Sequence, residues 1–124
     1  MNKIDLKNRT KKFALETIHF VNALPKSKSN DVISYQILKS ATSVTANYRA
    51  SLRGRSTAEF ISKLNIVLEE ADETMFWYEI IEETNDKLDI SKLKLLHKES
   101  DELTAIFTAS LKTAKANLNS KSKL

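Results

Sequence analysis

Glu16 and His19 are the residues most suggestive of metal chemistry, three positions apart in Glu16-Thr17-Ile18-His19. This spacing places two ligands on one helical face, as in the di-iron sites of ferritin-like bundles. Such a site needs the motif twice, together with two further glutamates. The other histidine, His97, has Lys94 where its glutamate would stand. We therefore expect neither a metal site nor a cofactor.

A cluster of four carboxylates, Glu69, Glu70, Asp72 and Glu73, could in principle carry out general acid–base chemistry. A catalytic site would also need partners such as a nucleophile, a histidine base or a glycine-rich phosphate loop, and the sequence places none beside the cluster. A solvated acidic face, or a face that pairs with arginine, explains the cluster better. We expect no enzymatic activity.

Two polar lines run beside the apolar stripes of the second and third expected helices. The first line consists of Gln36, Ser40, Ser43 and Asn47, and the second of Glu59, Lys63, Glu70, Glu73 and Trp77. Such lines are either plain solvent faces or a contact between subunits, where buried polar groups set the register. For a subunit contact, the candidate interface residues are Gln36, Ser40, Ser43, Asn47, Glu73 and Trp77.

Charge is unevenly distributed along the chain, although the net charge is only +4. Residues 1–55 hold 11 basic and 3 acidic side chains, residues 56–102 hold 5 and 13, and residues 103–124 hold 4 and none. A basic surface attracts phosphate through charge and counterion release. Two alternatives stay open. The arginines of the second helix could pair with carboxylates of the third, or basic and acidic surfaces of different copies could meet in a ring.

The elements that must position these side chains are four helices, because apolar residues recur three and four positions apart. The expected ranges are Asp5–Leu24, Asp31–Leu52, Thr57–Asn85 and Ile90–Asn117. With one glycine and one proline, the chain can form few tight turns, which disfavours β-rich folds. We predict an all-α, antiparallel up-down-up-down four-helix bundle over residues 1–118, followed by a polar tail at 119–124.

Local signals indicate where these helices begin and end. Pro25 ends the first helix, and Ser29 or Asn30 is available to cap the second. Gly54 is placed to let the chain leave the second helix. The segment Ser56-Thr57-Ala58-Glu59 is typical of a capping box that begins the third.

The length of 124 residues is that of one domain. No apolar run approaches the ~18 to 20 residues that span a bilayer. The N-terminus carries no apolar signal region, and the chain lacks cysteine. These features predict a cytoplasmic protein without a membrane partner.

Up-down topology would bring most basic residues to one pole of the bundle. Only Asp5 and Glu59 oppose them there. The basic residues expected at this pole are Lys3, Lys7, Arg9, Lys11, Lys12, Arg49, Arg53, Arg55, Lys63, Lys112, Lys115, Lys121 and Lys123.

Several motifs along residues 9–80 resemble those of one protein family. They are Arg9-Thr10-x-x-Phe13-Ala14, Leu24-Pro25, the block from Gln36 to Ala50, Ser56-x-x-Glu59-Phe60-Ile61-x-Lys63-Leu64, and Glu69-Glu70-Ala71-Asp72-Glu73-Thr74-x-x-Trp77. The chain resembles the 23S rRNA-intervening-sequence proteins, which are four-helix bundles. It departs from the family pattern at Lys39, where arginine is usual, and at Ala41 and Thr45, where glycine is usual. A lysine cannot reproduce the bidentate geometry of arginine.

The resemblance implies a ring-shaped homopentamer. The chain is also similar to the accessory variability determinant proteins of diversity-generating retroelements, which are basic and bind nucleic acid and a reverse transcriptase. Carried over by position, the basic residues nearest the motifs are Arg49, Arg53 and Lys63. The candidate nucleic-acid-binding residues are therefore Arg9, Lys12, Arg49, Arg53, Arg55 and Lys63.

Two functions follow from these patterns. The first is a homo-oligomeric bundle that binds structured RNA or DNA through its basic pole, mostly by phosphate contacts. The second is a protein-interaction adaptor that assembles through its second and third helices and binds no nucleic acid.

Overall fold

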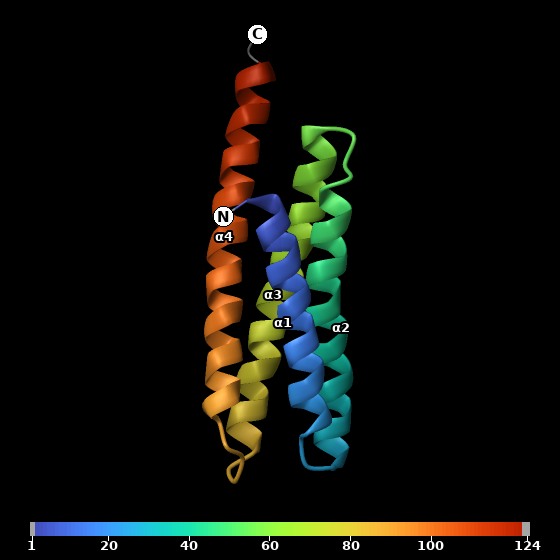
Figure 1. Ribbon diagram of the computed structural model, residues 1–124, viewed down its shortest axis with the longest axis vertical. Coiled ribbons are helices and arrows are strands. Elements are labelled where there is room, and N and C mark those ends of the chain that lie inside the picture. Colours follow the sequence, from blue (N-terminus) through green and yellow to red (C-terminus); the bar gives the residue numbers. More distant parts are fainter. Residues whose placement is uncertain (1, 123–124) are drawn as a thin grey trace.

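The chain folds into four helices that run alternately up and down beside one another (Figure 1). The computed structural model describes residues 2–122, and the side chains of residues 2–120. Its helices are α1 (Lys3–Asn22), α2 (Lys28–Ser51), α3 (Thr57–Thr84) and α4 (Ser91–Ser122). The predicted all-α, up-down four-helix bundle is confirmed.

The second helix begins earlier than the sequence analysis expected. Ser27, in extended conformation, accepts a hydrogen bond from the Asn30 backbone N at 3.0 Å, so Ser27 is the cap and neither Ser29 nor Asn30 is. The prediction chose the wrong member of a run of polar residues, because each of them is chemically able to cap. Asn30 instead lies buried, where its side-chain amide exchanges hydrogen bonds with that of Asn85.

The turn into α3 follows the expected motif with one change of partner. Ser56 accepts from the Glu59 backbone N at 3.1 Å, as predicted. The Glu59 carboxylate, however, accepts from the backbone N of Arg55 at 2.5 Å, one residue before the amide that a capping box would use. Gly54 is not in the left-handed region. A Cβ there would lie 3.2 Å from the Ser51 carbonyl oxygen, so a side chain at this position would require a small shift of that neighbour.

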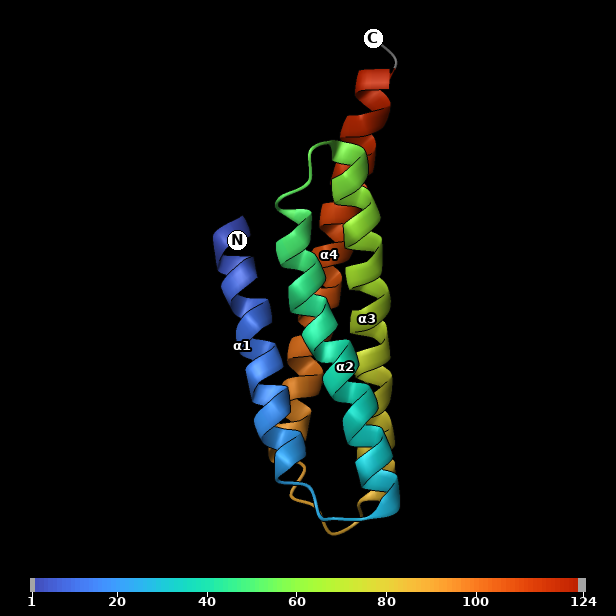
Figure 2. The same cartoon turned by 90° about the vertical axis from the view of Figure 1, so that its right-hand side faces the viewer.

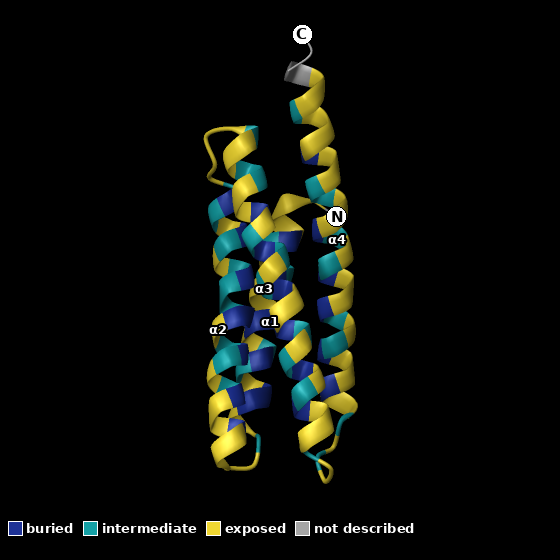
Figure 3. Cartoon of the chain, turned by 180° about the vertical axis from the view of Figure 1, so that it is seen from behind, coloured by how far each residue is buried: buried dark blue, intermediate teal, exposed yellow. Residues whose placement is uncertain are grey.

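The core is a stripe of apolar side chains along each helix, facing the bundle axis (Figure 3). Its largest fully buried members include Tyr48, Tyr78 and Phe107. The Tyr48 and Phe107 rings pack at 5.5 Å between centroids, and the Tyr78 hydroxyl is 2.5 Å from the Thr17 hydroxyl. Burying each such side chain stabilises the fold by about 1.5–3 kcal/mol, so the aromatic layers hold the helices in fixed register.

The ends of the helices are staggered at the pole where α2 meets α3 (Figure 1, Figure 2). There α1 begins well below the α2–α3 loop, whereas α4 rises past it. The fourth helix continues to Ser122, so residues 119–122 of the polar tail expected at 119–124 are helical, and residues 123 and 124 lie outside the described residues. In the described part of the chain, no helix is long and apolar enough to cross a membrane.

Candidate nucleic-acid interface

Six basic residues gather around the C-terminal end of α2 and form a surface that we call the basic strip. Its members are Lys7 and Lys11 of α1, Arg49 of α2, Arg53 and Arg55 of the α2–α3 loop, and Lys63 of α3. Lys7 is half-buried and the other five are exposed.

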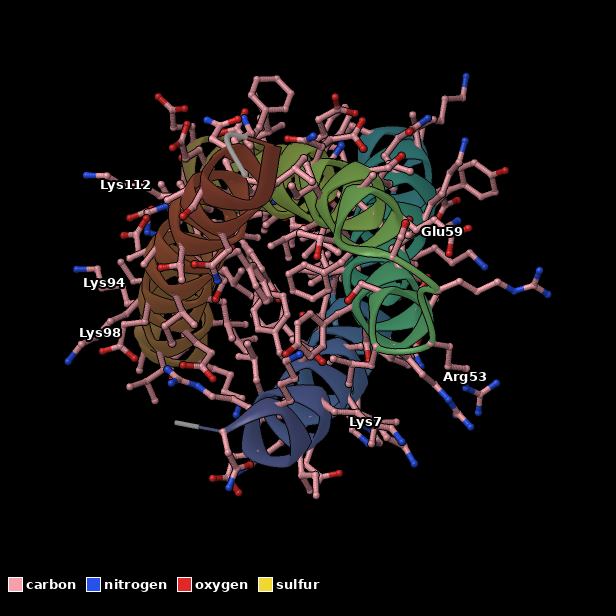
Figure 4. All side chains as sticks on the ribbon, turned by 90° about the horizontal axis from the view of Figure 1, so that it is seen from above. Lys7, Arg53, Glu59, Lys94, Lys98 and Lys112 are labelled. Carbon is pink, nitrogen blue, oxygen red and sulfur yellow. The ribbon has the colours of Figure 1, made fainter. Side chains whose placement is uncertain are left out.

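Neighbouring helices bring these residues together. The Thr10 hydroxyl of α1 donates a hydrogen bond to the Thr45 hydroxyl of α2 at 3.3 Å. This contact holds α1 and α2 side by side near their basic residues. Lys7 and Lys11 lie four positions apart on α1, so they share one helical face. Arg49 lies in the last turn of α2, and Arg53 follows two residues after this helix ends at Ser51. Lys7 and Arg53 project from the same side of the bundle (Figure 4).

A shallow, open hollow of about 330 Å³ lies at the α2–α3 end of the strip. Arg53 and Lys63 line it together with the Ser62 side chain and Gly54. Glu59 is the only acidic residue in its lining, and its carboxylate already accepts the Arg55 amide. The hollow therefore offers two cations and one hydroxyl, the donors that suit a phosphate group.

The described part of the chain does not neutralise the charges of the strip with ion pairs. Across residues 2–120, no ion pair includes any of its six side chains. The arginines of α2 thus do not pair with α3 carboxylates, which was one alternative for the charge distribution. Uncompensated cations on one surface produce a positive potential that attracts polyanions.

Arg9 and Lys12, two of the predicted binding residues, lie on the other flank of α1, toward α4. The Arg9 guanidinium forms ion pairs with Glu99 at 2.5 Å and with Glu102 at 2.7 Å. Its hydrogen bond to Glu99 is the main cause that raises the pKa of Arg9. Lys12 stays exposed, 3.9 Å from Glu16. Arg9 therefore ties α1 to α4 and does not extend the basic strip.

The expected basic pole is not one continuous patch. Lys112 projects from the side of the bundle opposite Lys7 and Arg53 (Figure 4). The side chains of Lys121 and Lys123 lie outside the described residues. The candidate site is therefore the basic strip. Of the six predicted binding residues, the strip includes Arg49, Arg53, Arg55 and Lys63.

Lys7 and Lys11 were counted at the pole but not among the predicted binding residues. Their four-residue spacing was the available signal, since it places both on one face of α1. What the sequence lacked was the orientation of that face, which the packing of α1 against α2 sets.

The sequence model of the 23S rRNA-intervening sequence protein family matches residues 2–109. The chain belongs to this family. It is similar to a solved structure from Bacteroides thetaiotaomicron, a protein with unknown function from the S23 ribosomal protein family. The two share 31% sequence identity with a TM-score of 0.81, over 90% of this chain and 99% of the other. None of the curated proteins matches this chain.

The match to the 23S rRNA-intervening sequence family includes every residue of the basic strip. It ends at residue 109, so the overhanging end of α4, with Lys112 and Lys115, lies beyond the matched part. The positions of the basic strip therefore lie within the part of the bundle that the family model matches, and the overhang lies outside it.

The predicted interface residues line the α2–α3 seam of this family member. Ser40 is buried, and the Thr74 hydroxyl donates to it at 2.9 Å, so Ser40 joins two helices of one chain. Asn47 is half-buried and donates to the Ser43 hydroxyl at 2.8 Å. Gln36, Ser43 and Trp77 are half-buried, and Glu73 is exposed. All of these except Ser40 keep some surface that a second copy could reach.

An exposed aromatic residue on the outer face of α3 was not among the predicted interface residues. Phe76 is 48% exposed, and its ring packs on Trp77 at 4.9 Å between centroids. Its neighbours three, four and seven positions away on α3 are Glu69, Asp72, Glu73, Glu79, Ile80 and Glu83. Nearby, burial and then the charge of Glu73 raise the pKa of Glu70. This outer face of α3 is therefore strongly acidic around an apolar centre.

Proposed function

We propose that this protein is a non-enzymatic, homo-oligomeric helical bundle that binds structured RNA or DNA through the basic strip. The observation that carries the proposal is the gathering of six cations from three helices and one loop, none of them in an ion pair within residues 2–120. The resemblance to proteins that bind nucleic acid supports the same assignment.

Phosphate contacts dominate such an interface. Arginine and lysine side chains on an open surface reach the backbone, whereas base edges are read from within a groove. Each neutralised phosphate releases counterions, so affinity falls as salt rises. The proposal therefore predicts salt-sensitive binding with little sequence selectivity.

Fluorescence anisotropy of a labelled RNA hairpin and a labelled DNA duplex, titrated across salt, tests this proposal. The test variant is Arg53→Glu/Arg55→Glu. The matched control is Lys94→Glu/Lys98→Glu, which changes net charge equally on the α4 side of the bundle (Figure 4). We expect the test variant to weaken binding of every sequence and to lower the salt slope by about two. The control should retain wild-type affinity.

Two results would count against the basic strip. One is unchanged affinity of Arg53→Glu/Arg55→Glu. The other is equal loss in both double variants, which would make binding a matter of net charge alone. Absence of wild-type binding even at low salt would leave the assembly role as the better explanation.

The second candidate function is an adaptor that assembles and recruits a protein through its α2–α3 side without binding nucleic acid. The exposed Phe76, next to the half-buried Trp77, favours it, because exposed aromatic residues anchor interfaces. In both versions we propose that copies associate through this side, in the ring of five that the family resemblance implies.

Sedimentation at micromolar concentration tests the assembly. Phe76→Ser should shift an oligomer toward monomer, whereas Leu95→Ser, which removes an exposed apolar side chain from α4, should not. A wild-type protein that sediments as a clean monomer would contradict the ring in both candidate functions.

A further inference from the structure

Four cations of the basic strip form two rows on neighbouring parts of the chain, and the spacing of these rows bears on which form of nucleic acid the strip accepts. Lys7 and Lys11 form one row on α1. Arg49, in the last turn of α2, and Arg53, in the turn that follows this helix, form a second row. Packed helices lie ~8–10 Å apart, so the two rows are separated by about this distance. Along α1, the four residues from Lys7 to Lys11 advance by ~6 Å.

Two parallel rows suit the phosphates of two strands. In B-form DNA the strands border grooves ~6 Å and ~12 Å wide, so phosphates of opposite strands face each other across comparable distances. Double-stranded RNA is likewise recognised by its shape and by contacts to its backbone and 2′-hydroxyls. A single strand would fill one row and leave the other unmatched.

The strip also lacks the aromatic side chains on which unpaired bases stack. Single-strand binding proteins combine a basic groove with such aromatic platforms. Among residues 2–120 the exposed aromatics are Tyr35 and Phe76. Tyr35 precedes Arg49 by 14 residues of α2, and Phe76 follows Lys63 by 13 residues of α3. At the rise of a helix, each aromatic residue therefore lies roughly 20 Å along the bundle from that cation.

Phe60, an aromatic residue near the strip in sequence, is not available for base stacking either. It is half-buried, and the Lys3 ammonium lies 5.1 Å from the centre of its ring. The hollow between Arg53 and Lys63 is shallow and open, so it does not enclose a strand.

We infer that the basic strip takes a double helix, contacts phosphates of both strands with its two rows, and discriminates against single strands. This inference rests on the proposed function and names the ligand class of the same site. α1 thereby becomes part of the binding surface, through Lys7 and Lys11.

The test compares a labelled RNA duplex with one of its component strands, chosen to be unstructured and of equal length, at matched ionic strength. The wild-type protein should bind the duplex at least about tenfold more tightly than the single strand. This difference should exceed the one that follows from the smaller salt slope of single strands. Lys7→Gln/Lys11→Gln should reduce duplex affinity more than single-strand affinity, because it removes one row. Lys94→Gln/Lys98→Gln is the control of equal charge and should keep the preference.

Different failures have different meanings. A single strand that binds as tightly as the duplex, or a preference that survives Lys7→Gln/Lys11→Gln, overturns the inference and leaves the proposed function standing. No binding of either form at low salt overturns both. If Lys7→Gln/Lys11→Gln fails to fold, Lys11→Gln/Arg49→Gln removes one exposed cation from each row. This variant should reduce the preference for duplex over single strand at least about twofold.

Discussion

Arg9 of α1 holds Glu99 of α4 with two parallel hydrogen bonds, from Nε to Oε2 at 2.7 Å and from Nη2 to Oε1 at 2.5 Å. The same Nη2 reaches Glu102 at 2.7 Å. Of the adjacent helix pairs, α1 and α4 pack least extensively. Polar contacts such as this one and the Lys92–Glu16 pair at 3.2 Å therefore matter more at the α1–α4 seam than at the others.

Replacing Arg9 by alanine should destabilise the bundle by about 1 kcal/mol, because it removes a bidentate, partly buried ion pair. Arg9→Lys should recover only part of this free energy, since lysine cannot form the two parallel bonds. Urea unfolding followed by circular dichroism measures both effects. Arg53→Ala is the control, because Arg53 has no ion pair in the described residues, and it should change stability by less than about 0.5 kcal/mol. Equal effects at the two positions would contradict the structural role of Arg9.

For nucleic-acid affinity, we expect the larger effect at Arg53 and the smaller effect at Arg9. Arg9→Gln and Arg53→Gln each remove one positive charge, but only Arg53 lies in the basic strip. Arg53→Gln should lower affinity and reduce the salt slope by about one, whereas Arg9→Gln should leave the slope unchanged. Anisotropy titrations at several salt concentrations give both slopes. A reduced slope for Arg9→Gln would mean that Arg9 exchanges its glutamates for phosphate on binding.

The buried hydroxyl pair of Ser40 and Thr74 should contribute to folding of the single chain. The Thr74 hydroxyl lies 2.9 Å from the Ser40 hydroxyl and 2.7 Å from the Glu70 carbonyl oxygen, so Thr74→Val removes a buried hydroxyl and leaves Ser40 without this partner. We expect a loss of about 1–2 kcal/mol in unfolding free energy. Thr108→Val, which removes a comparable bond to the Thr104 carbonyl on an exposed turn, should cost less. If Thr74→Val stayed fully stable but lost its oligomeric state, Ser40 would instead belong to the subunit interface.

Stability should fall at alkaline pH because of Tyr78. Burial is the main cause that raises the pKa of Tyr78, although the Thr17 hydroxyl opposes it. The folded state therefore holds the phenol proton more tightly than the unfolded chain does. The contribution is fully present below the unfolded pKa of about 10 and is lost above it, at up to about 1.4 kcal/mol per pH unit.

Chemical denaturation of the wild type and of Tyr78→Phe, from neutral pH to above the unfolded tyrosine pKa, isolates this contribution. Tyr78→Phe should lose the part of the alkaline slope that belongs to this phenol, because phenylalanine has no proton to release. Tyr35→Phe is the control, since Tyr35 is 66% exposed. Identical pH dependence in the wild type and Tyr78→Phe would show that Tyr78 does not titrate within the folded bundle.

The helices and their order could be predicted from the sequence, because the signals are local. Apolar residues three and four positions apart define a buried face within any one helix, whatever it packs against. The Ser56 cap was predicted correctly for the same reason, since its partner Glu59 is three residues away. The cap of α2 was not, because several neighbouring polar residues satisfy the same local rule and Asn30 has a partner 55 residues away.

Which side chains share a surface was decided only by the tertiary structure. Lys7, Arg9 and Lys11 are near neighbours of similar charge, and nothing local separates them. The fold turns Arg9 toward Glu99, 90 residues along the chain, and leaves Lys7 and Lys11 beside α2. Ser40 likewise belongs to a polar line that, from the sequence, was either a solvent face or a subunit contact. In the fold it bonds to Thr74 of α3 within the same chain. The sequence by itself determined the helices and the total charge. The pairing of charges and hydroxyls required the rotation of each helix about its axis, which packing between distant segments sets.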